Sequence, residues 1–221
     1  MEGTYKSQEH HLYSALKILI KKSWAFKRLL ATMVVGFGVG MSYYGMPLGL
    51  GNLSYNLYLS VALNALSNSL SSPILFFLIG KMKRKRSLVG WALLSGTCSV
   101  ASVFVRLKEM QMVLELLSFF SIGIIYGVLM IYTLELFPTC VRNSAVSITR
   151  ETVLFGGLLA PLLVALGKKN GFLSYGVFGV TISVCGLFAA WMPETKGRVL
   201  FDTMEEEERN DQEVNNSVNC A

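Results

Sequence analysis

The sequence Tyr-Thr-Leu-Glu-Leu-Phe-Pro-Thr-Cys-Val-Arg-Asn, at residues 132–143, decides how this chain is divided. A long apolar run stops at Glu135, the proline three residues later disfavours a continuous helix, and Arg142 opens the next apolar segment. A carboxylate and a guanidinium at the ends of two consecutive helices suit a charged clamp just outside a bilayer. A second stretch, Pro-Glu-Thr-Lys-Gly at 193–197, ends the last apolar run and brings Glu194 near the same surface.

The composition indicates a membrane protein. Hydrophobic residues make up 52% of the 221 residues and charged residues only 15%, whereas a soluble domain carries about 25% charge. The net charge is +6, but the cations lie in short clusters between apolar runs, which is typical of membrane topology signals and not of a nucleic-acid interface. The four cysteines form no C-x-x-C pair, so we expect buried thiols at 98 and 185 and no disulfide or zinc site.

Six apolar segments predict the fold. Each is long enough to cross a hydrocarbon core of roughly 30 Å, which takes about 20 helical residues. Backbone that crosses lipid must satisfy its own hydrogen bonds, so helices are expected. The chain is therefore predicted to be an all-α integral membrane protein with six transmembrane helices, placed at 29–50, 57–79, 88–105, 112–134, 145–166 and 173–192.

Lysine and arginine predict the orientation. With a cytosolic N-terminus, the cytosolic parts hold 16 basic residues and the opposite loops hold 4. This bias predicts a multi-pass protein with both termini in the cytosol, in either the plasma membrane or the vacuolar membrane. The predicted regions are a basic lead at 1–28, a six-helix domain at 29–192 and an acidic tail at 193–221.

Polar and aromatic residues inside the first two spans are candidates for a substrate cavity. Tyr43 and Tyr44 lie deep enough for their rings to stack on a substrate or hold a cation, although an interfacial aromatic belt would use the same residues. Asn64, Asn68 and Ser71 recur at i, i+4 and i+7 and so share one helix face. Such a stripe faces a watery cavity or makes interhelical hydrogen bonds.

Arg150 and Glu151 lie near the start of the fifth span, where a charge needs a partner or water. Adjacent residues on a helix do not face each other, so each needs a partner elsewhere. Gly156, Gly157 and Pro161 follow and can bend this helix at mid-membrane depth.

Five basic residues in the loop 81–86 have two interpretations. The loop is a topology signal that contacts anionic lipids, or it pairs with Glu135 and Glu194 at the cytosolic helix ends. Close helix approach is expected where glycines recur at four-residue spacing, as at 36 and 40 and at 123 and 127.

Two of these motifs resemble a known family. Glu-Leu-Phe-Pro-Thr-x-x-Arg-Asn at 135–143 and Pro-Glu-Thr-Lys-Gly at 193–197, two spans apart, resemble the C-terminal half of sugar-transporter-like members of the major facilitator superfamily. Within that group the chain looks most like the organic cation/carnitine transporters, particularly the plant type. Tyr-Tyr-Gly at 43–45, the basic loop, and the glycine pair with Pro161 add to the resemblance, which covers residues 12–200.

The resemblance implies a mechanism and roles. Such transporters have about twelve spans, in two halves that rock around a central site, and the six spans here would be the seventh to the twelfth. Tyr43 would line the substrate cavity. The implied cytosolic gate network consists of Arg84, Arg86, Glu135, Arg142 and Glu194.

The chain departs from the family pattern at two places. Animal cation transporters carry a substrate-attracting Asp twelve residues after the Arg of the first motif, where this chain has Leu154. The loop at 81–86 lacks the acidic residue and second glycine of the family motif.

The expected function is transport of small organic solutes, of the organic cation/carnitine class, by alternating access. The expected partners are the lipid bilayer, a small organic solute, and a homodimer mate or a separate N-terminal half. The alternative is a non-transporting truncated isoform that assembles with full-length transporters and regulates them. No signature of a P-loop, a zinc protease or a serine hydrolase occurs, so no enzyme activity, cofactor, metal or nucleic-acid partner is expected.

Overall fold

The structure, a computed structural model, describes residues 19, 21–49, 57–105, 107–166, 171–192, 195, 202, 205–206 and 208–209. All six regular elements in these ranges are helices, which confirms the predicted all-α class. They are α2 (Ser23–Gly49), α3 (Leu57–Lys81), α4 (Arg84–Phe104), α5 (Lys108–Leu136), α6 (Thr139–Leu166) and α7 (Gly171–Ala189). Most of the predicted basic lead and acidic tail lies outside the described residues.

Helix ends follow local chemistry. α5 and α6 are separated by Phe137 and Pro138, and Phe137 is extended with φ −118° and ψ 139°. A residue that precedes proline is pushed toward this conformation, because the proline ring crowds its backbone. The predicted break in the 132–143 stretch is confirmed. α4 begins at Arg84, four residues earlier than expected, so the basic loop contributes part of its first helical turn.

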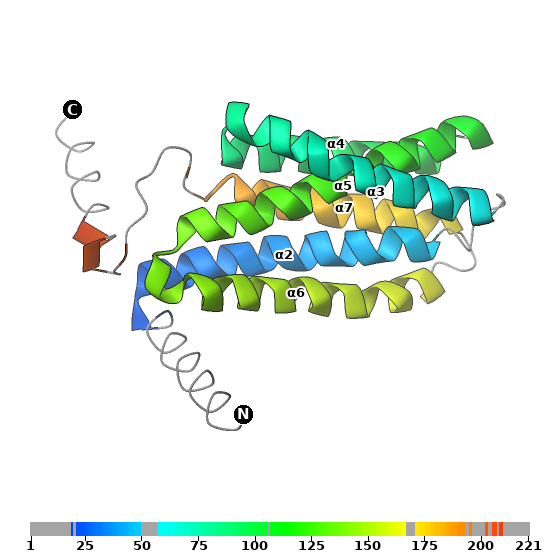
Figure 1. Cartoon of the computed structure of the whole chain (residues 1–221). Helices are drawn as coiled ribbons and strands as arrows, with labels where there is room; N and C mark the ends of the chain where they lie inside the picture. The colour runs from blue at the N-terminus through cyan, green and yellow to red at the C-terminus, as the bar shows by residue number, and fades with distance from the viewer. Residues whose placement is uncertain are drawn as a thin grey trace, which may run out of the picture.

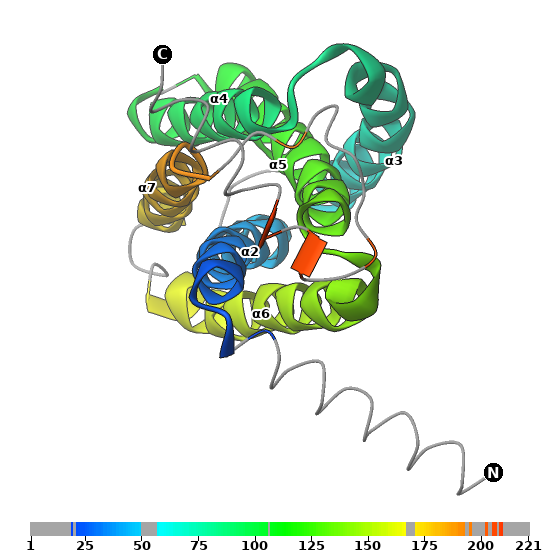
Figure 2. The same ribbon diagram turned by 90° about the vertical axis from the view of Figure 1, so that its left-hand side faces the viewer.

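Consecutive helices of the bundle run antiparallel, so α2 and α6 run parallel to each other (Figure 1). α2 lies against α6 on one side and α7 on another, and α4 packs on both α5 and α7. α3 packs mainly on α5 and lies at the edge of the bundle in the end view of Figure 2. The start of α2 and the end of α7 lie at the same end of the bundle (Figure 1).

Glycines set the closest helix contacts. A Cβ at Gly40 would overlap the carbonyl of Val153 in α6, and a Cβ at Gly156 would overlap the carbonyl of Phe37 in α2. Between α3 and α5, Gly123 faces the Ser71 side chain. The close approach expected from the glycine spacing is confirmed, because only a residue without a side chain fits at these positions.

The outer surface of the bundle is apolar. Phe76 and Phe77 of α3 are 76% and 73% exposed, and Phe155 and Leu158 of α6 are 66% and 70% exposed. Five helices are long and apolar enough to cross a membrane, and α7 contributes a shorter apolar stretch, Tyr175–Ala189. These features fit a multi-pass integral membrane protein, since large exposed apolar surfaces are rare in soluble monomers.

The expected burial of the thiols at 98 and 185 is confirmed. Cys98 and Cys185 are buried free thiols, and Cys140 is an exposed free thiol. Cys220 lies outside the described residues.

Candidate functional site

The main cavity lies between α2, α5 and α6 and has a volume of about 840 Å³. Among the described residues, Glu151 is the one charged side chain in its lining, and Leu154, one helical turn further along α6, also lines it. Residues three apart on a helix share a face, so Glu151 and Leu154 both point to this cavity. The lining residues are Tyr43, Tyr44, Pro47, Leu48, Phe119, Glu151, Leu154, Gly157, Leu158 and Pro161.

Aromatic rings form one wall of this cavity. Tyr43 stacks on Phe119 and Tyr126 of α5, with ring centroids 5.7 and 5.4 Å apart. Tyr44 meets Tyr43 edge-on at 5.4 Å and packs against Gly157, where a side chain would collide with its ring. Tyr44 remains 40% exposed. The wall therefore presents ring faces and a phenol to the cavity.

The polar stripe of α3 faces the interior of the bundle. Asn68 accepts a hydrogen bond from the Tyr43 hydroxyl at 3.3 Å, and so connects the stripe to the aromatic wall. Asn64 is buried and donates its amide to the Ser60 carbonyl of its own helix at 3.0 Å. Both asparagines line a smaller cavity of about 220 Å³ next to Phe119. Asn68 thus has a direct link to the main cavity, whereas Asn64 is satisfied within α3.

Glu151 also reaches a second cavity. This space of about 400 Å³ lies between α2 and α6, and its lining includes Phe37, Ser144 and Thr152 as well as Glu151. Arg150 is exposed and is not among the residues that line either space. Of the two adjacent charges predicted from the sequence, Glu151 alone reaches the cavities.

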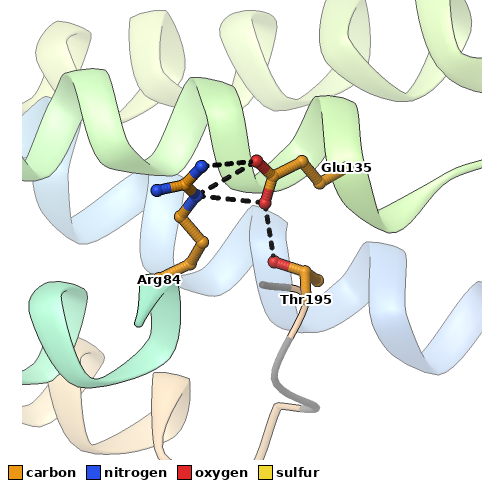
Figure 3. Close-up of polar contacts among 3 residues, drawn as sticks. All are labelled: Arg84, Glu135 and Thr195. Atoms are coloured by element: carbon orange, nitrogen blue, oxygen red, sulfur yellow. Dashed lines mark hydrogen bonds and ion pairs between the residues drawn. The ribbon is translucent and has the colours of Figure 1, made fainter. Parts of the chain in front are cut away.

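Near the C-terminal end of α5, Arg84, Glu135 and Thr195 form a cluster of polar contacts that we call the charged clamp (Figure 3). The Arg84 Nε lies 3.0 and 3.1 Å from the two Glu135 carboxylate oxygens, and the Arg84 Nη2 lies 2.9 Å from Oε1. Thr195 donates its hydroxyl to Glu135 Oε2 at 2.9 Å. The clamp therefore joins α4, α5 and the segment after α7, and its side chains are largely withdrawn from solvent.

The other predicted gate residues lie differently. Arg142 donates its Nε to the Phe137 carbonyl at 3.3 Å, and its Nη2 is buried without a hydrogen-bond partner among the described residues. Arg86 is exposed and pairs with no carboxylate in the described ranges. Glu194 lies outside the described residues. The structure thus brings Arg84 and Glu135 together and adds Thr195, which the sequence analysis did not single out.

A second buried carboxyl was missed from the sequence. Glu115 in α5 is 3% exposed, and the Tyr175 hydroxyl lies 2.6 Å from its Oε1. The sequence analysis treated 112–134 as one apolar span. The available signal was a polar stripe at i, i+4 and i+7, formed by Gln111, Glu115 and Ser118, which are all buried.

These features define an all-helical membrane protein with an aromatic cavity that contains one carboxylate. No family model matches the chain. It is 52% identical to organic cation/carnitine transporter 3 of Arabidopsis thaliana and 46% identical to transporter 2 of the same plant. These alignments cover 94% and 95% of this chain but only 40% and 41% of the two relatives. A solute carrier family 22 member 15-like protein of Xenopus laevis is 29% identical over 92% of the chain and 42% of its own length.

The chain is therefore a homologue of the organic cation/carnitine transporters, which confirms the resemblance drawn from the two charged motifs. It spans about two fifths of the length of the curated relatives it matches, consistent with the C-terminal half of such a transporter. These relatives are solute transporters and not enzymes, as the sequence analysis expected.

Proposed function

We propose that this chain is the C-terminal half of a transporter for small organic cations or zwitterions, including the carnitine class. The observation that carries the proposal is the cavity of about 840 Å³ in which Glu151 lies among tyrosine and phenylalanine rings. The named functions of the Arabidopsis relatives support the same solute class. Transport would proceed by alternating access, with this half rocking against a second half.

The chemistry of the cavity favours a positive charge. A quaternary or protonated amine is attracted to the faces of aromatic rings and to a carboxylate. Leu154 occupies the position where animal cation transporters carry an acidic residue, and this position lines the cavity. Glu151, three residues earlier on the same face, places a carboxylate in the same space. We infer that Glu151 takes over the attraction of the cation.

We also propose how the chain is arranged in the membrane. α7 has 19 residues, about 28 Å of helix at 1.5 Å per residue, which nearly spans a hydrocarbon core of about 30 Å. We propose six spans over 29–192, with the lead at 1–28 and the tail at 193–221 in the cytosol. The end that carries Arg84 and Glu135 would then face the cytosol, in the plasma or vacuolar membrane.

The clamp would act as the cytosolic gate. Arg84 and Glu135 hold α4 and α5 together at this end, and Thr195 adds the segment after α7. Arg142, with a buried nitrogen that has no partner among the described residues, is available to a further carboxylate. We propose that Arg142, Glu194 and Arg86 join Arg84 and Glu135 in a network that exchanges partners as the gate opens.

A partner half is part of the proposal. The α6 wall of the cavity is exposed at Leu154 and Leu158, so the described residues alone do not enclose a solute. A separate N-terminal half or a second copy of the chain would complete the pathway. The alternative function is a non-transporting protein that assembles with full-length transporters and regulates them.

Uptake into liposomes tests the proposal. The purified chain would be reconstituted, its oligomeric state fixed by crosslinking, and the uptake of labelled carnitine and tetraethylammonium measured. We expect saturable uptake and a loss of about tenfold in the Glu151→Gln variant, the equivalent of about 1.4 kcal/mol of lost attraction. Arg150→Gln, at the adjacent exposed position, is the matched control and should keep wild-type uptake. Folded protein in the bilayer with no uptake and no solute binding would favour the non-transporting alternative.

A further inference from the structure

Glu115 is a buried carboxyl to which the proposed transport cycle assigns no role. It lies 20 residues before Glu135 on α5, about 30 Å away along a helix that rises 1.5 Å per residue. The two carboxyl groups thus occupy opposite ends of one helix. Glu135 is bound by a guanidinium, whereas the one hydrogen bond to Glu115 from the described residues involves Tyr175 of α7.

The two hydrogen bonds of the Tyr175 hydroxyl indicate whether the Glu115 carboxyl carries a proton. Its hydroxyl oxygen lies 2.6 Å from Glu115 Oε1 and 3.1 Å from the backbone carbonyl of Met46 in α2. Met46 belongs to the last turn of α2, where carbonyls lack donors within the helix. A phenol has one hydrogen to donate, so it cannot serve a carboxylate and a carbonyl together. If Glu115 carries a proton, it donates to the Tyr175 oxygen while Tyr175 donates to Met46, and both of these contacts are hydrogen bonds.

The hydrogen bonds recorded for the neighbouring polar side chains go to groups other than Glu115. Gln111 donates its amide to the Ser102 carbonyl at 3.0 Å, and Ser118 bonds with Ser95 of α4. Ser99 donates to the backbone carbonyl of Tyr175 at 2.7 Å. These contacts fix the ends of α4, α5 and α7 around Glu115 but leave its carboxyl to Tyr175.

No cation in the described part of the chain pairs with Glu115. The charged residues of α2, α3 and α4 lie in the turns at the Glu135 end, and α7 has none. α5 itself carries Glu109 in its first turn, and α6 carries Arg142, Arg150 and Glu151; none of these described side chains bonds to Glu115. Tyr175 is the titratable side chain that contacts it. An ionised carboxylate with one hydrogen bond at this depth would be costly.

We propose that Glu115 is a proton-binding site that couples solute movement to a flow of protons, an inference that rests on the proposed function. In the packed state the proton is held on Glu115 and bonded to Tyr175. When α2 and α7 separate at this end, water enters, the carboxyl O–H bond breaks, and the proton passes to a water molecule. The hydrated carboxylate that remains must take up a proton before the end can pack again.

Infrared spectroscopy of the whole chain in lipid bilayers tests the proton directly. We expect a carbonyl stretch of a protonated carboxyl group at neutral pH that disappears in Glu115→Gln, whose amide keeps the shape and can donate to Tyr175. Tyr175→Phe should shift this band without removing it, because the band reports the hydrogen bond to the phenol. The matched control is Glu109→Gln, an exposed glutamate near the start of the same helix, which should leave the band unchanged.

Two results would overturn the inference. One is a neutral-pH spectrum in which wild type and Glu115→Gln have the same protonated-carboxyl signal. The other is a Glu115 carboxylate signal that changes on addition of sodium ions, which would make this a metal-cation site.

Uptake driven by an imposed pH gradient tests the coupling. Wild type should respond to the gradient, whereas Glu115→Gln should take up solute at a rate that the gradient does not change. Equal acceleration of both proteins would also overturn the coupling. The infrared result needs no transport, so loss of all uptake with an intact Glu115 band would count against the proposed function and not against the proton site.

Discussion

At the scale of the residue, Glu135 is held by three close contacts from Arg84 and one from Thr195. Hydrogen bonds to charged groups contribute about 1.5–3 kcal/mol each when they are well formed and shielded. The clamp is partly shielded, with 15% and 25% of the Arg84 and Glu135 side chains exposed. It is therefore expected to stabilise the closed end of the bundle more than a surface ion pair would.

The clamp predicts a measurable interaction energy. Glu135→Gln should lower the free energy of unfolding in mixed micelles by about 1–3 kcal/mol, because Arg84 loses its counter-charge. In a double-mutant cycle, Arg84→Gln and Glu135→Gln should be strongly non-additive. Arg150→Gln, at an exposed arginine of α6 outside this network, is the control and should change stability by less than about 0.5 kcal/mol. Strict additivity of the two clamp variants would show that the pair is not coupled.

The sequence singled out some of the residues of these sites but not others. The pairing of Glu135 with the basic loop was one of two interpretations of the sequence, and which of the five cations pairs depends on where α4 begins. Thr195 was missed because its hydroxyl matters only through a contact 60 residues away. Glu115 was missed because its partner, Tyr175, lies on another helix 60 residues along the chain.

At the scale of the element, α2 and α6 approach through a seam of glycines. Gly40 and Gly156 each face backbone atoms of the opposite helix. A backbone neighbour cannot move aside as the end of a flexible side chain can, so added volume there separates the helices. The same seam places Tyr44 over Gly157 and so shapes the main cavity.

A pair of alanine substitutions tests this seam. Gly40→Ala should destabilise the bundle by about 1–3 kcal/mol through overpacking. Gly90 of α4 has open space around it, so Gly90→Ala is the matched control and should be neutral or stabilising by up to about 1 kcal/mol through helix propensity. Unfolding of both variants in mixed micelles gives the comparison. Equal effects of the two substitutions would mean that the seam is loosely packed.

The helices were more predictable than their contacts. Length and apolar composition gave the helices of the described residues with ends up to six positions off, and Pro138 fixed one boundary by restricting the residue before it. The bundle order could not be read from periodicity, since nearly every face of these helices is apolar. Which polar face lies inside was settled by contacts such as Tyr43 with Asn68.

At the scale of the whole molecule, the bundle has two chemically different ends. One end carries the basic loop, the clamp and the start of α6, and the other carries Glu115, Tyr175 and the end of α2. Sixteen of twenty basic residues are assigned to the first end and its flanking segments by the sequence. This difference is the basis for placing the clamp end in the cytosol.

Thiol labelling tests this orientation. Cys140, in the first turn of α6, is exposed at the clamp end, whereas Cys98 and Cys185 are buried. In a Cys220→Ser background, a membrane-impermeant maleimide should modify Cys140 in the plasma membrane only after the cells are permeabilised. For a vacuolar protein, isolated intact vacuoles should be labelled directly. Labelling from the non-cytosolic side would reverse the topology.

The order of the helices in the chain also determines when α2 can pack against α6 during synthesis and membrane insertion. α2 ends at Gly49, but α6, one of its main neighbours, begins only at Thr139. At about 5–20 residues per second, a ribosome needs roughly 5–20 seconds to supply the intervening residues 50–138. During that interval the glycine seam of α2 lacks the helix that covers it. Its burial is therefore a late, post-insertion event, and nascent α2 depends on lipid or on the insertion machinery until α6 arrives.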